Sequence, residues 1–221
     1  MNNLRILEIL KMIPEHHNVL DVGTDHAYLP ILLKQQNKER TVVASDIHDN
    51  ALKMARASLE KAEMVEDVQL ILSDGLDNVD VDNLDTLVIA GMGTFTILSI
   101  LENSKALLFD IIIIQSNNNH EILRKAMNEK GFLLEEERVI CEANHYYPIM
   151  KYRKGKEVLT ETEILFGKYV LRNEAYYNYL YQKKFDLLKK IPSEKKEEIE
   201  LIKKDLLLIE SYLKGRKLDY S

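Results

Sequence analysis

Short apolar runs alternate with amphipathic stretches along the first two thirds of the chain. The run from Ile111 to Gln115 has four consecutive isoleucines, which is typical of a central parallel strand that is apolar on both faces. The predicted strands are Asn18 to Val22, Val42 to Asp46, Val68 to Leu72, Thr86 to Ala90, Ile111 to Gln115, Phe132 to Ile140 and Tyr146 to Tyr152. The predicted helices are Asn3 to Met12, Asn50 to Lys61, Thr94 to Leu101 and His120 to Glu129. These repeated units predict a doubly wound α/β sheet that ends in an antiparallel pair, with a ligand crevice at the carboxyl ends of the parallel strands.

The last third of the chain has a helical pattern. Thr160 to Glu163 has the form of a capping box, and the helix that it starts is expected to run to about Lys190, before Ile191-Pro192. A second helix has a heptad seam, and the first has a weaker stripe. The seam is Ile199, Ile202, Leu206, Ile209 and Leu213, and the stripe is Tyr169, Tyr176, Leu180 and Leu187. An antiparallel coiled-coil hairpin is predicted, with domains at 1–157 and 158–221.

Composition narrows the class of protein. Of the 221 residues 46% are hydrophobic and 30% are charged, as in a soluble globular protein. The single cysteine, Cys141, excludes an internal disulfide framework and a thiolate zinc cluster, and the six histidines do not cluster with acids at metal-ligand spacing. The apolar runs are too short to span a bilayer, and the N-terminal stretch has acids and a proline too early for a secretory signal. We therefore expect a cytoplasmic protein with no metal and no membrane partner.

The net charge of −6 does not suggest a nucleic-acid-binding protein, but it is unevenly distributed. Residues 1–150 have 13 Lys and Arg against 24 Asp and Glu, a net of −11. Residues 151–221 have 17 against 12, a net of +5. A basic C-terminal region is a candidate surface for a polyanion, although a Lys-rich helix is often only a solvated face.

The loop after the first predicted strand reads Asp-Val-Gly-Thr-Asp-His-Ala. A nicotinamide-binding loop has three glycines, so that the backbone can approach a pyrophosphate. Here Gly23 is the only glycine, and the acids Asp21 and Asp25 stand on either side of it. Acids at this place favour a ligand with positive charge and no phosphates. S-adenosylmethionine (SAM), with its sulfonium and ammonium groups, fits this requirement.

Three further loops follow predicted strands. Asp46 can accept hydrogen bonds from both ribose hydroxyls, and Asp74 from an adenine amino group. The loop Ala90 to Gly93 has small residues that allow close approach of the backbone to a ligand. Each loop alone is weak evidence, because an acid after a strand is often only a helix N-cap. All four in order favour SAM over a nicotinamide cofactor.

Several motifs together resemble one family of enzymes. They are DVGTDHAYLP (Asp21 to Pro30), SDGL (Ser73 to Leu76), VIAGMG (Val88 to Gly93), QSN (Gln115 to Asn117) and LRKAMNEKGF (Leu123 to Phe132). From Leu4 to about Gly215 the chain resembles the TrmK family, bacterial methyltransferases of N1 of adenine 22 in the D-arm region of tRNA. The resemblance implies a Rossmann-like class I SAM-dependent methyltransferase domain with a seven-stranded, mostly parallel sheet, followed by the helical hairpin. The chain departs from the family at Ser116, usually proline, and at Thr94, usually glycine, and Ser116 is expected to leave its loop less constrained.

The resemblance also implies roles for residues. The residues expected to hold SAM are Asp21, Gly23, Thr24, Asp46, Ile47, Asp74, Gly75, Ala90 and Gly91. The residues expected at the mouth of the site are Asp25, His26 and Tyr28 as catalytic residues, with Gln115 and Asn117 across from them for the substrate. Two simpler interpretations stay open, because His26 could cap the following helix and Tyr28 could be ordinary packing.

The basic hairpin is the expected docking surface for tRNA. Its candidate contacts are Lys183, Lys184, Lys189 and Lys190, and a monomer is favoured over a dimer. Two alternatives remain for the whole chain. In one, a SAM-dependent methyltransferase acts on a small molecule or a protein and uses the tail for dimerisation. In the other, the chain is a scaffold that binds SAM or RNA without catalysis.

Overall fold

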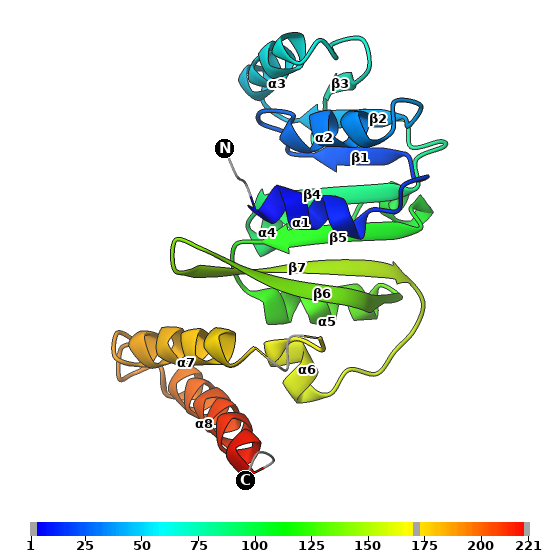
Figure 1. Cartoon of the computed structure of the whole chain (residues 1–221). Helices are drawn as coiled ribbons and strands as arrows, with labels where there is room; N and C mark the ends of the chain where they lie inside the picture. Colours follow the sequence, from blue (N-terminus) through cyan, green and yellow to red (C-terminus); the bar gives the residue numbers. More distant parts are fainter. Residues whose placement is uncertain (1–3, 170–172, 219–221) are drawn as a thin grey trace. The chain divides into compact units, whose positions relative to one another are not determined.

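A computed structural model of the chain describes residues 4–169 and 173–218 (Figure 1). The chain divides into two compact units, Met1–Val158 and Leu159–Ser221, which we call the first unit and the second unit. Each unit has hydrophobic clusters of its own, so each is considered separately.

The first unit is built on one seven-stranded sheet. Its strands are β1 (Val19–Val22), β2 (Val42–Asp46), β3 (Gln69–Leu72), β4 (Thr86–Met92), β5 (Ile111–Ser116), β6 (Phe132–Glu142) and β7 (His145–Lys154). Their order in the sheet is β3-β2-β1-β4-β5-β7-β6. The strands β1 to β5 pair in parallel, and β7 is antiparallel to both β5 and β6. The predicted seven-stranded, mostly parallel sheet is confirmed.

Helices cover both faces of this sheet (Figure 1). They are α1 (Leu4–Met12), α2 (Tyr28–Gln36), α3 (Asp49–Lys61), α4 (Thr94–Ile100) and α5 (His120–Glu129), and a short 3-10 helix spans Ser104–Leu108. Buried residues of α1, α2 and α3 share one core cluster, and those of α4 and α5 share the other. The isoleucines of β5 alternate between the two clusters, which is why that run needs no polar face.

This topology fixes where a ligand can bind. The strand order reverses at β1 and β4, because the chain builds outward from β1 to β3 and then returns to the other side of β1. At such a switch point the loops after neighbouring parallel strands separate to opposite faces and leave a crevice. The loops after β1, β2, β3, β4 and β5 all end at this edge of the sheet.

The second unit consists of α6 (Glu161–Phe166), α7 (Glu174–Leu188) and α8 (Lys196–Leu218). The predicted capping box is present, since the Thr160 hydroxyl accepts from the Glu163 N–H and the Glu163 carboxylate accepts from the Thr160 N–H. The single first helix predicted up to Lys190 is wrong. Gly167, with φ 97°, ends α6 after six residues, because only glycine adopts that backbone at little cost. Tyr169, which the sequence places in the stripe of that first helix, lies outside any helix.

The heptad seam of α8 faces the interior of the second unit. Ile202, Leu206 and Ile209 are buried, and Ile209 packs with Phe166 of α6 and Tyr177 of α7. The stripe on the first predicted helix is only partly confirmed. Tyr176 is buried and Leu180 joins the cluster, but Tyr169 and Leu187 are exposed. The second unit is therefore a small three-helix structure with an aromatic core.

Among residues 4–169 and 173–218, no group of three or more His, Cys, Asp or Glu side chains is arranged to hold a metal ion. In the same part of the chain, no helix combines the length and the apolar character needed to cross a membrane.

Candidate active site and cofactor pocket

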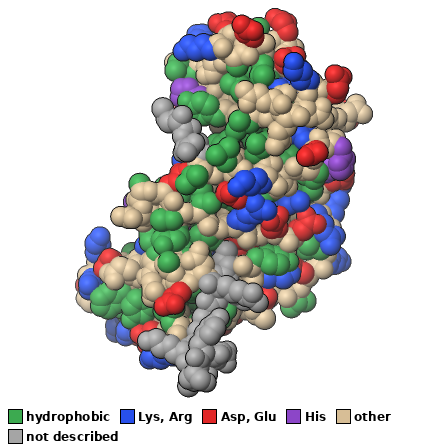
Figure 2. All heavy atoms as spheres, in the orientation of Figure 1, with side chains coloured by type: hydrophobic (Ala, Val, Ile, Leu, Met, Phe, Trp, Pro, Cys, Tyr) green, Lys and Arg blue, Asp and Glu red, His purple; other side chains and the backbone are tan. Residues whose placement is uncertain are grey.

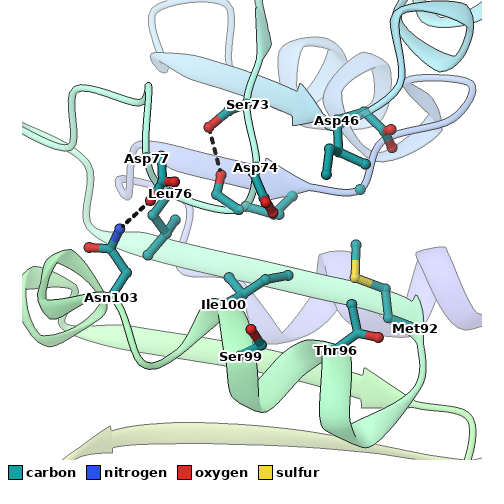
Figure 3. Close-up of a pocket in the computed structure, with 14 residues that line it drawn as sticks. Asp46, Ser73, Asp74, Leu76, Asp77, Met92, Thr96, Ser99, Ile100 and Asn103 are labelled. Carbon is teal, nitrogen blue, oxygen red and sulfur yellow. Dashed lines mark hydrogen bonds between the residues drawn. The ribbon is translucent and has the colours of Figure 1, made fainter.

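Two cavities open at the carboxyl edge of the sheet, and both are lined by Gly23. The first cavity, of about 250 Å³, lies between the ends of β2 and β3 and helix α4 (Figure 3). It is lined by Val22, Gly23, Asp46, Ile47, Ser73, Asp74, Gly75, Leu76, Asp77, Met92, Thr96, Ser99, Ile100 and Asn103. The second cavity, of about 370 Å³, is lined by Arg5, Ile6, Ile9, Asp21, Gly23, Thr24, Asp25, His26, Ala27, Tyr28, Leu29, Ala90, Gly91 and Gln115. Two cavities that share a backbone residue suit one elongated ligand.

Gly23 is where the two cavities meet, and its position requires glycine. Its φ of +84° lies in the left-handed region, where other residues are strained. A Cβ there would also lie 2.1 Å from the Cε of Met92, although the end of that flexible side chain could move aside. The N–H groups of Gly23 and Thr24 both donate to the Ser45 carbonyl, at 2.8 and 3.1 Å. These two hydrogen bonds fold the loop back onto β2. Gly23 lines the first cavity on one side and the second cavity on the other.

Two acids and a turn shape the first cavity. Asp46 ends β2 and accepts a hydrogen bond from the His48 N–H at 2.7 Å through one carboxylate oxygen, which leaves the other oxygen available. Asp74 is exposed at the rim, in a turn that the Ser73 hydroxyl stabilises by donating to the Gly75 carbonyl at 3.1 Å. Figure 3 shows Asp46 and Asp74 on the side opposite α4. The first cavity therefore offers hydrogen-bond acceptors to a ligand that carries hydroxyl and amino groups.

The first cavity also contains residues that the sequence did not reveal. Thr96, Ser99 and Ile100 come from α4, and Asn103 follows it. The Asn103 amide donates to the Asp77 carboxylate at 3.0 Å, which ties this wall to the turn after β3. No motif marks these residues, because they reach the cavity through the packing of α4 onto the sheet.

Asp21 is a buried acid in the second cavity. Burial raises the pKa of its carboxyl to about 6, the side-chain hydrogen bond with Thr24 opposes this rise, and the charge of Asp46 adds to it. Because the folded chain holds this proton more tightly than the unfolded chain, the group lowers stability above pH 6, and this cost disappears below about pH 4. A cation next to Asp21 would relieve the cost.

The three residues predicted at the mouth lie together. His26 Nε2 is 3.4 Å from Asp25 Oδ2, and the rings of His26 and Tyr28 are 5.3 Å apart at 32°. Neither simpler interpretation agrees with the structure. The N-cap of α2 is Ala27, in the left-handed region with φ 52° and without a side-chain cap, so His26 does not cap the helix. Tyr28 is 42% exposed and lines the cavity rather than packing in the core.

The loop after β5 places the two predicted substrate residues differently. Gln115 lines the second cavity, where its Oε1 accepts from the Gly91 N–H at 3.1 Å. Asn117 does not line either cavity. Its amide donates to the Gly91 carbonyl at 2.8 Å, so Gln115 and Asn117 together hold both backbone groups of Gly91. Asn117 therefore contacts the lining of the second cavity through that glycine.

Ser116 and Thr94, the two departures from the family pattern, contact each other. Their hydroxyl oxygens are 2.7 Å apart, so one hydroxyl donates to the other. Both oxygens also lie within hydrogen-bond distance of the Asn118 carbonyl, which accepts from the remaining hydroxyl hydrogen. The Thr94 N–H also donates to the Asn118 amide oxygen at 3.2 Å. The expectation that Ser116 leaves the loop less constrained is therefore wrong, because the pair of buried hydroxyls forms bonds of its own.

The four lysines predicted to contact tRNA are not equivalent. Lys184 forms an ion pair at 2.6 Å with the buried Asp205, and Lys189 lies 3.6 Å from Asp186. Among the described residues, Lys183 and Lys190 have no carboxylate within 4.0 Å. On the face drawn in Figure 2, acidic and basic side chains are interspersed rather than forming one basic patch.

The division into units also changes the charge balance. Residues 159–221 have 13 Lys and Arg against 11 Asp and Glu, a net of +2. Residues 1–158 have 17 against 25, a net of −8. The difference of three from the split at residue 150 arises because four basic residues and one acid, Glu157, belong to the first unit. The basic residues are Lys151, Arg153, Lys154 and Lys156.

A model of one protein family matches most of the chain. The family is described as TrmK, tRNA (adenine(22)-N(1))-methyltransferase, and the match runs over residues 19–211. The chain belongs to the TrmK family. Membership in TrmK confirms the resemblance seen in the sequence, together with the Rossmann-like fold, the SAM cofactor and the reaction, methylation of N1 of adenine 22 in tRNA. It favours tRNA as the substrate over a small molecule or a protein.

Individual relatives agree with the family match. The tRNA (adenine(22)-N(1))-methyltransferase of Bacillus subtilis is 28% identical over 153 residues, which cover 68% of this chain and 64% of that enzyme. The structure of M. capricolum TrmK in complex with S-adenosyl-homocysteine has a TM-score of 0.85, at 32% identity over 97% of this chain and 98% of that chain. The B. subtilis TrmK structure, at 20% identity and a TM-score of 0.82 over 95% of this chain and 97% of that chain, shows the shared fold.

Proposed function

We propose that this TrmK family member carries out its reaction across the two cavities that meet at Gly23. SAM would lie with its adenosine in the first cavity and its methionine in the second, and the target adenine would enter at Asp25, His26 and Tyr28. The observation that carries the proposal is that both cavities are lined by Gly23 and that acids line each of them, Asp46 and Asp74 in the first and Asp21 and Asp25 in the second.

The first cavity supports binding of the adenosine. The free carboxylate oxygen of Asp46 can accept from the ribose hydroxyls, and Asp74 can accept from the adenine amino group. Ile47, an exposed side chain that lines the cavity, offers an apolar surface to the purine ring. The left-handed turn at Gly75, with φ +52°, brings the backbone close to the space proposed for the adenosine.

The second cavity supports binding of the methionine end. Asp21 and Asp25 supply negative charge for the ammonium and the sulfonium, and the small residues Ala90 and Gly91 leave space along the backbone. SAM supplies an electrophilic methyl group when it is bound. This chain contributes by orientation, because methyl transfer needs the nucleophile in line with the bond that breaks.

The mouth of the second cavity supports chemistry on an extruded base. Adenine N1 has a lone pair, so no base is needed to create the nucleophile, but positive charge develops on the ring. Asp25 accepts a hydrogen bond from N6 and stabilises that charge. The base must leave its stack, at a cost of a few kcal/mol, and stacking on Tyr28 repays about 1–3 kcal/mol.

The second unit is the proposed docking surface for the D-arm region of tRNA, and the chain acts as a monomer in the cytoplasm, where its substrate is. The first unit has a net charge of −8, so it is unsuited to hold phosphates alone. Lys183 and Lys190, which have no ion-pair partner among the described residues, are the strongest candidates for phosphate contacts. Lys184 instead stabilises the helix pair through Asp205.

The affinity for SAM is expected to depend on the protonation of Asp21. Because burial raises the pKa of Asp21 to about 6 in the absence of ligand, SAM binding should weaken about tenfold from pH 7 to pH 5. Calorimetric titration with SAM at these two pH values measures the change. In Asp21→Asn the affinity should be lower and nearly independent of pH. An unchanged affinity between pH 7 and pH 5 in the wild type would place the cation away from Asp21.

A further inference from the structure

Arg5 is a basic residue of the second cavity to which the proposed function gives no role. It lies in the first turn of α1 and lines the cavity together with Asp21 and Thr24. No other lysine or arginine lines that cavity among the described residues. Arg5 thus supplies the one permanent positive charge in a cavity that otherwise has two acids.

The Arg5 side chain has an ion pair on one side and an aromatic ring on the other. Its Nε lies 3.0 Å from Oε2 of Glu142, and its main-chain N–H donates to Oε1 of the same carboxylate at 3.2 Å. The guanidinium carbon lies 4.7 Å from the centre of the Tyr147 ring. Glu142 ends β6 and Tyr147 lies on β7, so a single hairpin holds the guanidinium.

This arrangement leaves part of the guanidinium available. The two terminal nitrogens of Arg5 have no hydrogen-bond partner among the residues that the structure describes. A guanidinium stacked on a ring has its N–H donors in its own plane, where two of them can bind both oxygens of a carboxylate or phosphate. The side chain is half-buried and not closed off, with 30% of its surface exposed.

The ligand placed in this cavity has a matching group. The methionine end of SAM has a carboxylate beside its ammonium, and a carboxylate close to Asp21 and Asp25 would be repelled unless a cation accompanies it. We propose that Arg5 binds the carboxylate of the methionine of SAM, and that Glu142 and Tyr147 are positioning residues for Arg5. The proposal rests on the placement of SAM in the proposed function.

A second contact between α1 and the β6–β7 hairpin provides a matched control. Arg138 Nη1 lies 2.9 Å from Oε2 of Glu8, so it links β6 to α1 as Glu142 does. Arg138 does not line either cavity. A variant at Arg138 therefore weakens the docking of α1 without removing a group that faces the ligand.

The test compares two ligands that differ by one group. SAM and decarboxylated SAM are titrated calorimetrically into the wild type, Arg5→Gln, Glu142→Gln and Arg138→Gln. In Arg5→Gln the affinity for SAM should fall about 10- to 100-fold, while that for decarboxylated SAM stays within about twofold. Glu142→Gln should show the same selective loss with a smaller amplitude. Arg138→Gln should bind both ligands as the wild type does.

Three results would overturn the proposal. An equal loss for both ligands in Arg5→Gln would mean that Arg5 only supports the fold. Unchanged SAM binding in Arg5→Gln would exclude the carboxylate contact, and weaker tRNA binding in the same variant would then assign Arg5 to a phosphate. A selective loss in Arg138→Gln as large as that in Arg5→Gln would assign the effect to the docking of α1. A wild type that binds neither ligand would instead contradict the proposed function.

Discussion

Asp25→Asn is expected to lower the single-turnover rate of methyl transfer about 100- to 1,000-fold while the dissociation constant of SAM changes by no more than about twofold. The substitution keeps the size of the side chain and removes its charge, and the loss of one group that stabilises developing charge typically has an effect of this size. The Asp25 side chain is exposed at the mouth and is 3.4 Å from His26, so the fold does not depend on it. Rapid-quench measurement with saturating SAM and tRNA gives the rate.

Asp74→Asn is the matched control for this experiment. Asp74 is an exposed acid of the first cavity, so its loss should weaken SAM binding and leave the rate at saturation close to that of the wild type. If Asp25→Asn instead lost SAM binding and kept its rate at saturation, Asp25 would be a cofactor ligand, and the electrostatic role would have to be abandoned.

Deletion of residues 159–221 is expected to abolish methylation of tRNA and to preserve SAM binding. Both cavities are lined only by residues of the first unit, and that unit has two hydrophobic clusters of its own. Without the second unit, the remaining acidic unit has too few phosphate contacts, because affinity for nucleic acid depends on the number of phosphates that are neutralised. Calorimetry with SAM and a methylation assay with tRNA test the two parts separately.

Two charge variants of the full chain test the proposed docking surface more locally than the deletion does. Lys183→Glu combined with Lys190→Glu should raise the KM for tRNA and reduce its dependence on salt. Lys203→Glu is the control in the same second unit, because Lys203 is already paired with Glu200 at 2.8 Å. Undiminished activity of the truncated chain, or equal effects of the two charge changes, would refute docking by this surface.

Most strands of the first unit follow from the sequence, because its central strands β1, β2, β4 and β5 are mostly buried and apolar. Helix α2 (Tyr28–Gln36) is not among the predicted helices. The isoleucines of β5 and the bounds of β2 and α5 illustrate how a buried strand or an amphipathic helix determines its own pattern. The break between α6 and α7 was missed. Gly167 at the end of α6 and Asn173, whose side chain caps α7, are local signs of it. The capping box at Thr160 correctly predicts a helix start but contains no information about the length of the helix.

The residues of the site were likewise predictable only in part from the sequence. Asp21, Asp46, Asp74 and Gly23 lie on strand ends, so the topology alone places them at one edge. Arg5 was missed because its position depends on Glu142, 137 residues away in the chain. Such a contact arises from tertiary packing, and no local pattern records it. The walls that α4 contributes were missed for the same reason.

The most direct test of the whole account uses the full-length chain, labelled SAM and tRNA that lacks the modification. After the reaction the tRNA is digested to nucleosides, and the site is mapped with a second tRNA in which adenine 22 is replaced by guanine. The account predicts N1-methyladenosine in the first tRNA and no methylated nucleoside in the second. Equal methylation of both tRNAs, or none of the first, would contradict it.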